Sequence, residues 1–308
     1  MGVDIGGSNL RLALADRHGT IIGRWRTSTN ETSSPEQVLQ QIAQGVHDLL
    51  RKASLPRTAL SAIAAGVPGV TDAERGVVIV TSYLKGWSHV SLQQLLESAF
   101  HVPAAIDNDV RLAALGEHWM GAARGIDDFV FLAIGTGIGA GIFANGQLIR
   151  GHTFTAGEVG YMYLPGGPLE PPRHGEPGAL EQALGGEGIR QQWVKTSNSD
   201  PQVSALCATD VFARAACGDH LARGVLDLSA QLLAYAVYNI SAVLNSSLFV
   251  LGGSIGASLQ LIEATEHRLD SYAVPARPNL VISNLGTDAQ LVGALRLALT
   301  TAQVRTKS

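Results

Sequence analysis

The sequence predicts an α/β protein built from two similar halves with a cleft between them. Apolar runs typical of strands alternate along the chain with amphipathic stretches typical of helices, which favours layers of sheet and helix. Each half opens in the same way, with a strand, a glycine-rich turn and a returning strand. The first opening covers residues 1–15 and the second covers residues 129–144. This repetition indicates a weak internal duplication.

The first half contains start and stop signals for its elements. Ser34 is a helix N-cap followed by Pro35 at the first helical position, and Pro68-Gly69 ends an apolar strand. We expect strands at residues 1–4, 9–15, 20–27, 60–67 and 104–106, and helices at residues 34–52, 91–100 and 108–120.

The second half repeats this alternation. We expect strands at residues 129–134, 140–144 and 248–251, helices at 221–244 and 257–272, and a polar, proline-rich surface excursion at 165–177. The predicted domains are a smaller N-terminal α/β domain, residues 1–108, and a larger C-terminal α/β domain, residues 109–308. A C-terminal helix at residues 289–303 can return to the N-terminal domain.

Composition restricts the class of protein. The 308 residues are 46% apolar and 16% charged, which is enough for two packed domains with ordered cores. The formal net charge of -4 gives no basic surface for nucleic acid and no polybasic segment for a membrane. No apolar run approaches the ~20 residues of a membrane-spanning helix, and the start of the sequence does not resemble a signal peptide. We therefore expect a cytoplasmic protein that binds neither nucleic acid nor membrane.

The two cysteines, Cys207 and Cys217, lie in alanine-rich sequence typical of a helix. Their spacing suits neither a metal knuckle nor a disulfide framework. We therefore interpret both as small core residues in a reducing cytosol.

The glycine turns are candidate phosphate sites. A strand–turn–strand hairpin directs backbone N–H groups at one point, which suits phosphate oxygens, and Gly6-Gly7-Ser8 and Gly135-Thr136-Gly137 occupy equivalent places in the two halves. Neither is a Walker loop or a dinucleotide fingerprint, because no Gly-Lys-Ser/Thr follows and a strand comes next. One such turn alone would indicate only a tight hairpin. The third cluster, Gly252-Gly253-Ser254, again follows a strand and favours a ligand.

Two acidic positions are candidates for chemistry. Asp4 ends a buried strand beside a glycine turn, where an acid is costly unless it binds something; Mg²⁺, bound through water, and a capping role in the turn are the two alternatives. Asp107-Asn108-Asp109 lies where a strand ends and a helix begins, the edge at which open α/β sheets bind ligands. Phosphoryl transfer to an alcohol needs a carboxylate to orient the hydroxyl and accept its proton. The structural alternative for this triplet is ordinary helix capping.

Several motifs occur in a familiar order along nearly the whole chain. They are Asp4-Ile5-Gly6-Gly7-Ser8-Asn9, Gly66-Val67-Pro68-Gly69, Leu84-Lys85-Gly86-Trp87, Asp107-Asn108-Asp109, Leu132-Ala133-Ile134-Gly135-Thr136-Gly137-Ile138-Gly139, Ala156-Gly157-Glu158-Val159-Gly160, Gly178-Ala179-Leu180-Glu181, Gly252-Gly253-Ser254 and Gly293-Ala294. In this order they resemble the ROK family (repressors, open reading frames, kinases).

The resemblance implies an actin-like ATPase fold of the hexokinase type, with ATP and Mg²⁺ as cofactors and a sugar as the small-molecule substrate. The position matching the family's catalytic base is Asp109. The positions matching its sugar site are Gly66, Gly69, Asn108, Glu158, Glu181 and, in place of a histidine, Tyr161. The positions matching its nucleotide site are Asp4, Gly6, Gly7, Ser8, Asn9, Gly135, Thr136, Gly137, Gly252 and Gly253, with Asp4 toward Mg²⁺.

The sequence departs from the family at its zinc knuckle. The knuckle positions are Pro172, His174 and Ala179, and the family histidine is Tyr161, so four zinc ligands cannot be assembled and we expect no zinc. Tyr161 can contact the sugar, orient Glu158 or simply fill the space of the knuckle. Arg111 is a second departure, at a position where the family commonly has Asn.

These features favour a kinase over a regulator. The first glycine turn begins at Gly6, which leaves no room for the helix-turn-helix that precedes it in repressors of the family. We therefore expect an ATP-dependent kinase of a hexose or related sugar, glucokinase-like and homodimeric. The alternatives are a non-catalytic sugar-binding regulator of the same family, or a kinase of another sugar such as a β-glucoside, N-acetylmannosamine or fructose.

Overall fold

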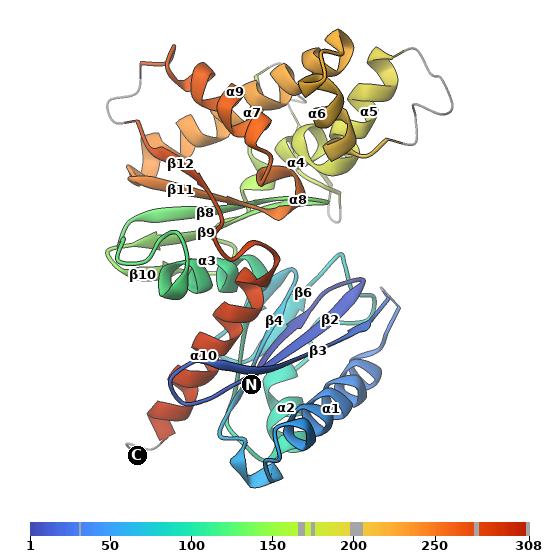
Figure 1. Cartoon of the computed structure of the whole chain (residues 1–308), viewed down its shortest axis with the longest axis vertical. Coiled ribbons are helices and arrows are strands. Elements are labelled where there is room, and N and C mark those ends of the chain that lie inside the picture. The colour runs from blue at the N-terminus through green and yellow to red at the C-terminus, as the bar shows by residue number, and fades with distance from the viewer. Residues whose placement is uncertain (31, 166–169, 174–175, 198–205, 274–276, 306–308) are drawn as a thin grey trace. The chain divides into compact units, whose positions relative to one another are not determined.

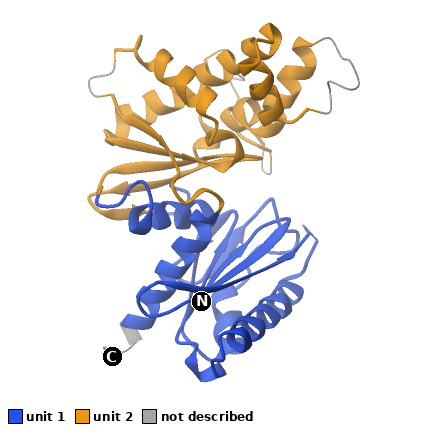
Figure 2. Cartoon of the chain, in the orientation of Figure 1, with its two compact units in different colours: residues 1–125, 150–156, 288–308 blue, residues 126–149, 157–287 orange. Residues whose placement is uncertain are grey.

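The computed structural model describes residues 1–30, 32–165, 170–173, 176–197, 206–273 and 277–305. This part of the chain forms two compact units, coloured separately in Figure 2. Unit 1 comprises residues 1–125, 150–156 and 288–308, and unit 2 comprises residues 126–149 and 157–287. Among the helices described, none is both long and apolar enough to cross a membrane.

Unit 1 is built on a five-stranded mixed sheet with the order β3-β2-β1-β4-β7. Its strands are β1 (Gly2–Ile5), β2 (Asn9–Ala15), β3 (Ile21–Ser28), β4 (Ile63–Val67) and β7 (Ala104–Asn108). The pairs β1–β2 and β2–β3 are antiparallel, whereas the pairs β1–β4 and β4–β7 are parallel. A separate two-stranded ribbon pairs β5 (Val70–Asp72) with β6 (Val77–Val80).

Alternation along β2 assigns the two faces of this sheet. Leu10, Leu12 and Leu14 belong to the core shared with α1 (Pro35–Lys52) and α2 (Leu92–Phe100), whereas Ala13 packs against α10 (Ala289–Arg305). Successive side chains of a strand point to opposite faces, so one amphipathic strand supports helices on both sides. In Figure 1, α1 and α2 lie on one side of this sheet and α10 on the other.

The helix α3 (Asp109–Met120) packs against α10 through glycines. A Cβ atom on Gly293 would lie 1.8 Å from the carbonyl oxygen of Leu112, and one on Gly116 would lie 2.4 Å from that of Ala289. The two backbones can therefore meet only because these side chains are absent. This contact places α3 and α10 in unit 1; the domain boundary predicted after residue 108 stays a prediction.

Unit 2 repeats the sheet of unit 1. Its strands are β8 (Phe129–Ile134), β9 (Ile138–Ala144), β10 (Gln147–Ile149), β11 (Leu248–Gly252) and β12 (Asn279–Ile282). Their order is β10-β9-β8-β11-β12, with antiparallel β8, β9 and β10 and with β11 and β12 parallel to β8. The same sequence of pairings occurs in both sheets, which confirms the predicted internal duplication.

Helices bury one face of this second sheet. They are α4 (Ala179–Leu184), α5 (Gly186–Thr196), α6 (Ala208–Ala216), α7 (His220–Leu244), α8 (Gly253–Gly256) and α9 (Leu259–Leu269). Leu132 and Phe249 of the sheet join Leu233 of α7 in one buried core. The single-turn helices η1 (Arg57–Ala59), η2 (Val159–Tyr161) and η3 (Gly286–Asp288) complete the described elements. The predicted surface excursion at 165–177 lies partly outside the described residues.

Both cysteines are exposed, so the prediction that they are core residues was wrong. They flank α6, with Cys207 at its N-cap and Cys217 at its C-cap. The helix buries the periodic set Ala208, Val211 and Ala215, and the two cysteines lie just outside that set.

Candidate active site

Asn108 joins the end of β7 to the start of α3. Its side-chain oxygen accepts a hydrogen bond from the backbone N–H of Arg111 at 3.0 Å, which makes it the N-cap of the helix. Its Nδ2 donates to the carbonyl oxygen of Gly69 at 3.0 Å. The capping interpretation is therefore correct for Asn108, and the second N–H of its amide is a candidate ligand donor.

Asp109 is the first residue of α3, and its side chain is half-buried. Its Oδ1 accepts a hydrogen bond from the N–H of Val110 at 2.9 Å. The N-terminus of a helix favours negative charge, because unpaired backbone N–H groups point out of it. A carboxylate is thus held at the C-terminal edge of the sheet, where the sequence places the proton acceptor. Its role as a base stays a prediction.

The two glycines predicted to line the same site lie beside this junction. A Cβ atom on Gly66 would lie 3.7 Å from the Cα of Asp109 and 2.9 Å from a methyl group of Leu112. Gly69 has φ +98°, and a Cβ there would lie 2.3 Å from the carbonyl oxygen of Val80. Gly69 therefore needs glycine for the backbone to pass close to β6, whereas a side chain at Gly66 would displace the Leu112 methyl group.

We expect Gly69→Ala to lower the free energy of unfolding by about 2–5 kcal/mol. The left-handed backbone conformation accounts for about 1–2 kcal/mol and the contact with Val80 for about 1–3 kcal/mol. The matched control is Gly218→Ala, because Gly218 has φ +91° but open space around it. Denaturant unfolding followed by tryptophan fluorescence measures both. Equal losses in the two variants would contradict the close approach at Gly69.

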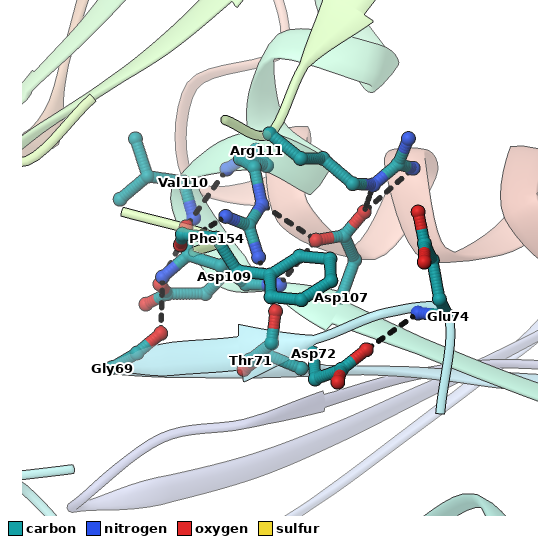
Figure 3. Close-up of polar contacts among 11 residues, drawn as sticks. Gly69, Thr71, Asp72, Glu74, Asp107, Asp109, Val110, Arg111 and Phe154 are labelled. Carbon is teal, nitrogen blue, oxygen red and sulfur yellow. Dashed lines mark hydrogen bonds and ion pairs between the residues drawn. The ribbon is translucent and has the colours of Figure 1, made fainter. Parts of the chain in front are cut away.

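A buried ion-pair network lies next to this junction (Figure 3). Arg111 and Asp107 pair at 2.6 Å between Nε and Oδ1, and both side chains are almost fully buried. Arg150 pairs with the other carboxylate oxygen of Asp107 at 2.8 Å. The sequence marked Arg111 only as a departure from the family. The signal that could have found this pair is weak, because Asp107 lies in β7 and Arg111 in the first turn of α3, so the spacing of four is not a helical one.

The first glycine turn is a tight hairpin braced by the end of β3. The N–H of Gly6 donates to the carbonyl oxygen of Asn9 at 2.8 Å. The Thr29 hydroxyl donates to the carbonyl oxygen of Gly6 at 2.7 Å, and its N–H donates to that of Ser8 at 3.1 Å. Gly7 follows Gly6 in the turn, and Ser8 and Asn9 are exposed. These hydrogen bonds within the protein fix the shape of the turn, and the Ser8 and Asn9 side chains face solvent.

Asp4 is buried at the end of β1, and its partner is Arg11. Both Nε and Nη2 of Arg11 contact Oδ2 of Asp4, at 2.8 and 2.6 Å. Burial raises the pKa of the Asp4 carboxyl, and the charge and hydrogen bond of Arg11 oppose this rise. The sequence interpretation missed this partner. The pair with Arg11 involves Oδ2, and a carboxylate has a second oxygen, so the side chain fits a water-mediated cation as well.

The second glycine turn lies against two helix starts of unit 2. The N–H of Gly135 donates to the carbonyl oxygen of Gly137 at 3.0 Å, and the N–H of Gly186, at the start of α5, donates to that of Gly135 at 2.8 Å. Between the two glycines, Thr136 is exposed. Gly253 begins α8 with φ +80°, and a Cβ there would lie 2.3 Å from the carbonyl oxygen of Ile134. Unit 2 thus brings the Gly135 turn together with the cluster at Gly252 and Gly253.

Glu158, Tyr161 and Glu181 gather at the start of α4. Glu181 Oε2 accepts a hydrogen bond from the N–H of Ile138 at 2.8 Å. Burial, and then the negative charges of Glu158 and Glu181, raise the pKa of the Tyr161 hydroxyl. That hydroxyl donates to the carbonyl oxygen of Glu176 at 3.4 Å, and the side chain is exposed. Unit 2 therefore brings together the three side chains that the resemblance assigns to the sugar.

The predicted absence of zinc is not tested at the positions that match the knuckle. Among the described residues, no group of three or more His, Cys, Asp or Glu side chains is arranged to hold a metal ion. His174 and the neighbouring Gly175 lie outside the described residues, so the zinc-free knuckle stays a prediction.

Comparison with known proteins shows the family. The sequence matches the profile of the ROK family over residues 1–301. It is 30% identical to a glucokinase of Halalkalibacterium halodurans over 95% of this chain and 92% of that protein. It is 27% identical to a beta-glucoside kinase of Listeria monocytogenes, with 88% and 87% of the two chains covered. The chain therefore belongs to the ROK family.

A solved structure gives the fold class. The ROK hexokinase of Thermus thermophilus is 26% identical to this chain and matches it with a TM-score of 0.79 over 99% of this chain and 98% of that one. ROK sugar kinases have the actin-like ATPase fold, so the predicted fold class is confirmed.

Proposed function

We propose that this protein is an ATP-dependent sugar kinase that transfers the terminal phosphate of ATP to a hydroxyl of a hexose or related sugar. The observation that carries the proposal is the intact carboxylate of Asp109 at the head of α3, in a chain 30% identical to a protein named glucokinase over 95% of its length. Glucose is the first substrate to test for the same reason.

The proposed reaction uses Asp109 as its base. The sugar hydroxyl oxygen attacks the terminal phosphorus, its proton passes to the Asp109 carboxylate, and the bond from that phosphorus to the ADP oxygen breaks. Asn108, held by Gly69 and by the start of α3, is placed to donate to a neighbouring sugar hydroxyl. We assign Gly66, which lies beside Asp109, to the same sugar site. We assign Glu158, Tyr161 and Glu181 of unit 2 to other hydroxyls of the sugar.

The nucleotide would be held by backbone groups. The Gly6–Asn9 turn and the Gly135–Gly137 turn present N–H groups to phosphate oxygens, and Gly252 and Gly253 belong to the adenosine side. The overall charge is -4, so the triphosphate depends on these local donors. Mg²⁺, when bound with ATP, supplies charge neutralisation at the phosphates, and Asp4 would hold it through water.

A coupled assay of ADP release tests the proposal. The panel contains glucose, a β-glucoside, N-acetylmannosamine and fructose, each with MgATP, and the phosphorylated product is identified by mass spectrometry. We expect ADP release that depends on at least one of these sugars. Sugar binding without any turnover would instead identify a non-catalytic regulator, and lack of both would refute the proposed site.

Tyr161→Phe tests whether this residue contacts the sugar. If the hydroxyl binds substrate, losing one neutral hydrogen bond costs about 0.5–1.5 kcal/mol, which raises the sugar KM by up to about tenfold. The matched control is Tyr163→Phe, two residues along and also exposed. Steady-state kinetics with the preferred sugar measures both variants. An unchanged KM would leave Tyr161 with only its contact to the Glu176 carbonyl.

The assembly, the compartment and the metal content are proposals of the same kind. We propose a cytoplasmic homodimer that contains no zinc. Sedimentation equilibrium of the purified protein measures the assembly, and metal analysis measures the zinc; one equivalent of zinc per chain would contradict the interpretation of the knuckle positions.

A further inference from the structure

The Arg111 side chain binds three separate segments of unit 1 (Figure 3). Nε donates to Asp107 Oδ1 at 2.6 Å, Nη1 donates to the carbonyl oxygen of Phe154 at 2.8 Å, and Nη2 donates to that of Thr71 at 2.8 Å. The side chain is 2% exposed. A planar guanidinium presents donors in fixed directions from three separate nitrogens, whereas the three donors of an ammonium all leave one nitrogen and cannot span the same three acceptors.

Asp107 joins a second arginine to the same network. Its Oδ2 accepts from Nε of Arg150 at 2.8 Å, and its side chain is fully buried. Two guanidinium groups therefore share one carboxylate. Arg150 is 35% exposed, whereas Arg111 is enclosed, so Arg111 is the member that depends most on these contacts.

The segment of residues 150–156 is held in unit 1 by these contacts. The stretches before and after it, residues 126–149 and 157–287, belong to unit 2. The segment is folded on itself, with the N–H of Ala156 donating to the carbonyl oxygen of Arg150 at 3.2 Å. Phe154 has φ +61°, a left-handed backbone conformation that is unfavourable for a residue with a side chain. Its carbonyl oxygen is the one bound by Arg111.

Arg111 also contacts residues on both sides of the proposed sugar site. Its backbone N–H binds the side chain of Asn108, whose amide binds the carbonyl oxygen of Gly69. Its Nη2 binds the carbonyl oxygen of Thr71, two residues beyond Gly69. Gly69 and the adjoining strand β5 are thus attached to the head of α3 at two points, one through the Asn108 amide and one through the Arg111 side chain.

We propose that Arg111 is a positioning residue for the sugar. It fixes the junction that carries Asn108 and Asp109 against the Gly69–Thr71 loop, and it fixes the 150–156 segment to the same junction. The nucleotide-binding turns are not part of this network. The inference rests on the proposed function, because it concerns the geometry of that site.

Arg111→Lys is the sharpest test, because it keeps a positive charge beside Asp107 and removes the planar guanidinium with its fixed donors. We expect kcat/KM for the sugar to fall about 10–100-fold, as small misplacement of a bound substrate does, and KM for ATP to change less than twofold. Hydrogen exchange of a peptide covering residues 150–157 should become faster, while exchange of a peptide from α1 stays the same.

Two further variants keep the test decisive. Arg150→Met removes the partly exposed ion pair with Asp107. This variant is therefore expected to fold and to show the same effects more weakly. Leu96→Ala, in the core of the same unit, lowers stability without touching the network, and its sugar kinetics should match those of the parent.

The outcomes separate the two hypotheses. Unchanged sugar kinetics and unchanged exchange of residues 150–157 in both arginine variants would overturn the positioning role. A Leu96→Ala variant with the same loss of sugar kcat/KM would also overturn it, because the effect would then follow stability. A parent protein without activity on any sugar would refute the proposed function, and exchange of the 150–157 peptide would still test the anchoring.

Discussion

Asp109→Asn is expected to lower kcat by about 10²–10⁴-fold, the usual contribution of a positioned general base. The amide keeps the size of the carboxylate and one acceptor oxygen, so the N–H of Val110 keeps its hydrogen bond. It cannot accept the proton of the sugar hydroxyl. Sugar affinity should therefore change far less than turnover. Single-turnover kinetics measures the chemical step, and calorimetric titration measures the affinity.

A surface carboxylate provides the control for this variant. Asp16 caps an exposed turn by accepting from the N–H groups of His18 and Thr20, and Asn can make the same contacts. Asp16→Asn should keep the turnover of the parent. If Asp109→Asn also keeps most of its turnover, Asp109 is only a helix-start residue and the base lies elsewhere.

The strands that open each half could be predicted because they are short, mainly apolar runs on either side of a glycine turn. Leu10, Leu12 and Leu14 form a period of two that ends at a glycine turn, and β2 has the predicted limits of 9–15. The short strands β5, β6, β10 and β12 were missed because three or four residues give no readable period. The helices α4 and α5 were missed as well, since glycines at their N-caps provide no side-chain signal.

The network around Arg111 could be predicted only in part. The spacing from Asp107 is local, but two of its three acceptors are backbone carbonyls of Thr71 and Phe154, 40 and 43 residues away. Any residue type carries a carbonyl, so nothing in the sequence marks these two positions. The partner of Asp4 was missed for a different reason: a buried acid indicates that something binds it without indicating what, and Arg11 is identified only by the register of β1 with β2.

Asp4→Asn should lower kcat/KM for MgATP by about 100-fold, because charge stabilisation around a catalytic metal contributes several kcal/mol. The apparent activation constant for Mg²⁺ should rise as well. The ion pair with Arg11 offers the competing explanation, since Asp4→Asn also breaks that pair. Arg11→Met is therefore the matched control: it breaks the same pair and leaves the carboxylate. At alkaline pH, which favours the ionised form of Asp4 in both proteins, Arg11→Met should keep the Mg²⁺ requirement of the parent.

The pH dependence of kcat/KM for MgATP should shift in a defined direction between these variants. Burial raises the pKa of Asp4, and Arg11 lowers it. Removing Arg11 should therefore raise the pKa of Asp4 further. If the ionised carboxylate is the active form, the acid limb of kcat/KM for MgATP lies above the ordinary pKa of an aspartate. It should then move to higher pH in Arg11→Met, and the contribution of Asp4 should be absent from the profile of Asp4→Asn. Identical Mg²⁺ activation in Asp4→Asn and Arg11→Met, with no shift of the acid limb, would assign Asp4 to the ion pair alone.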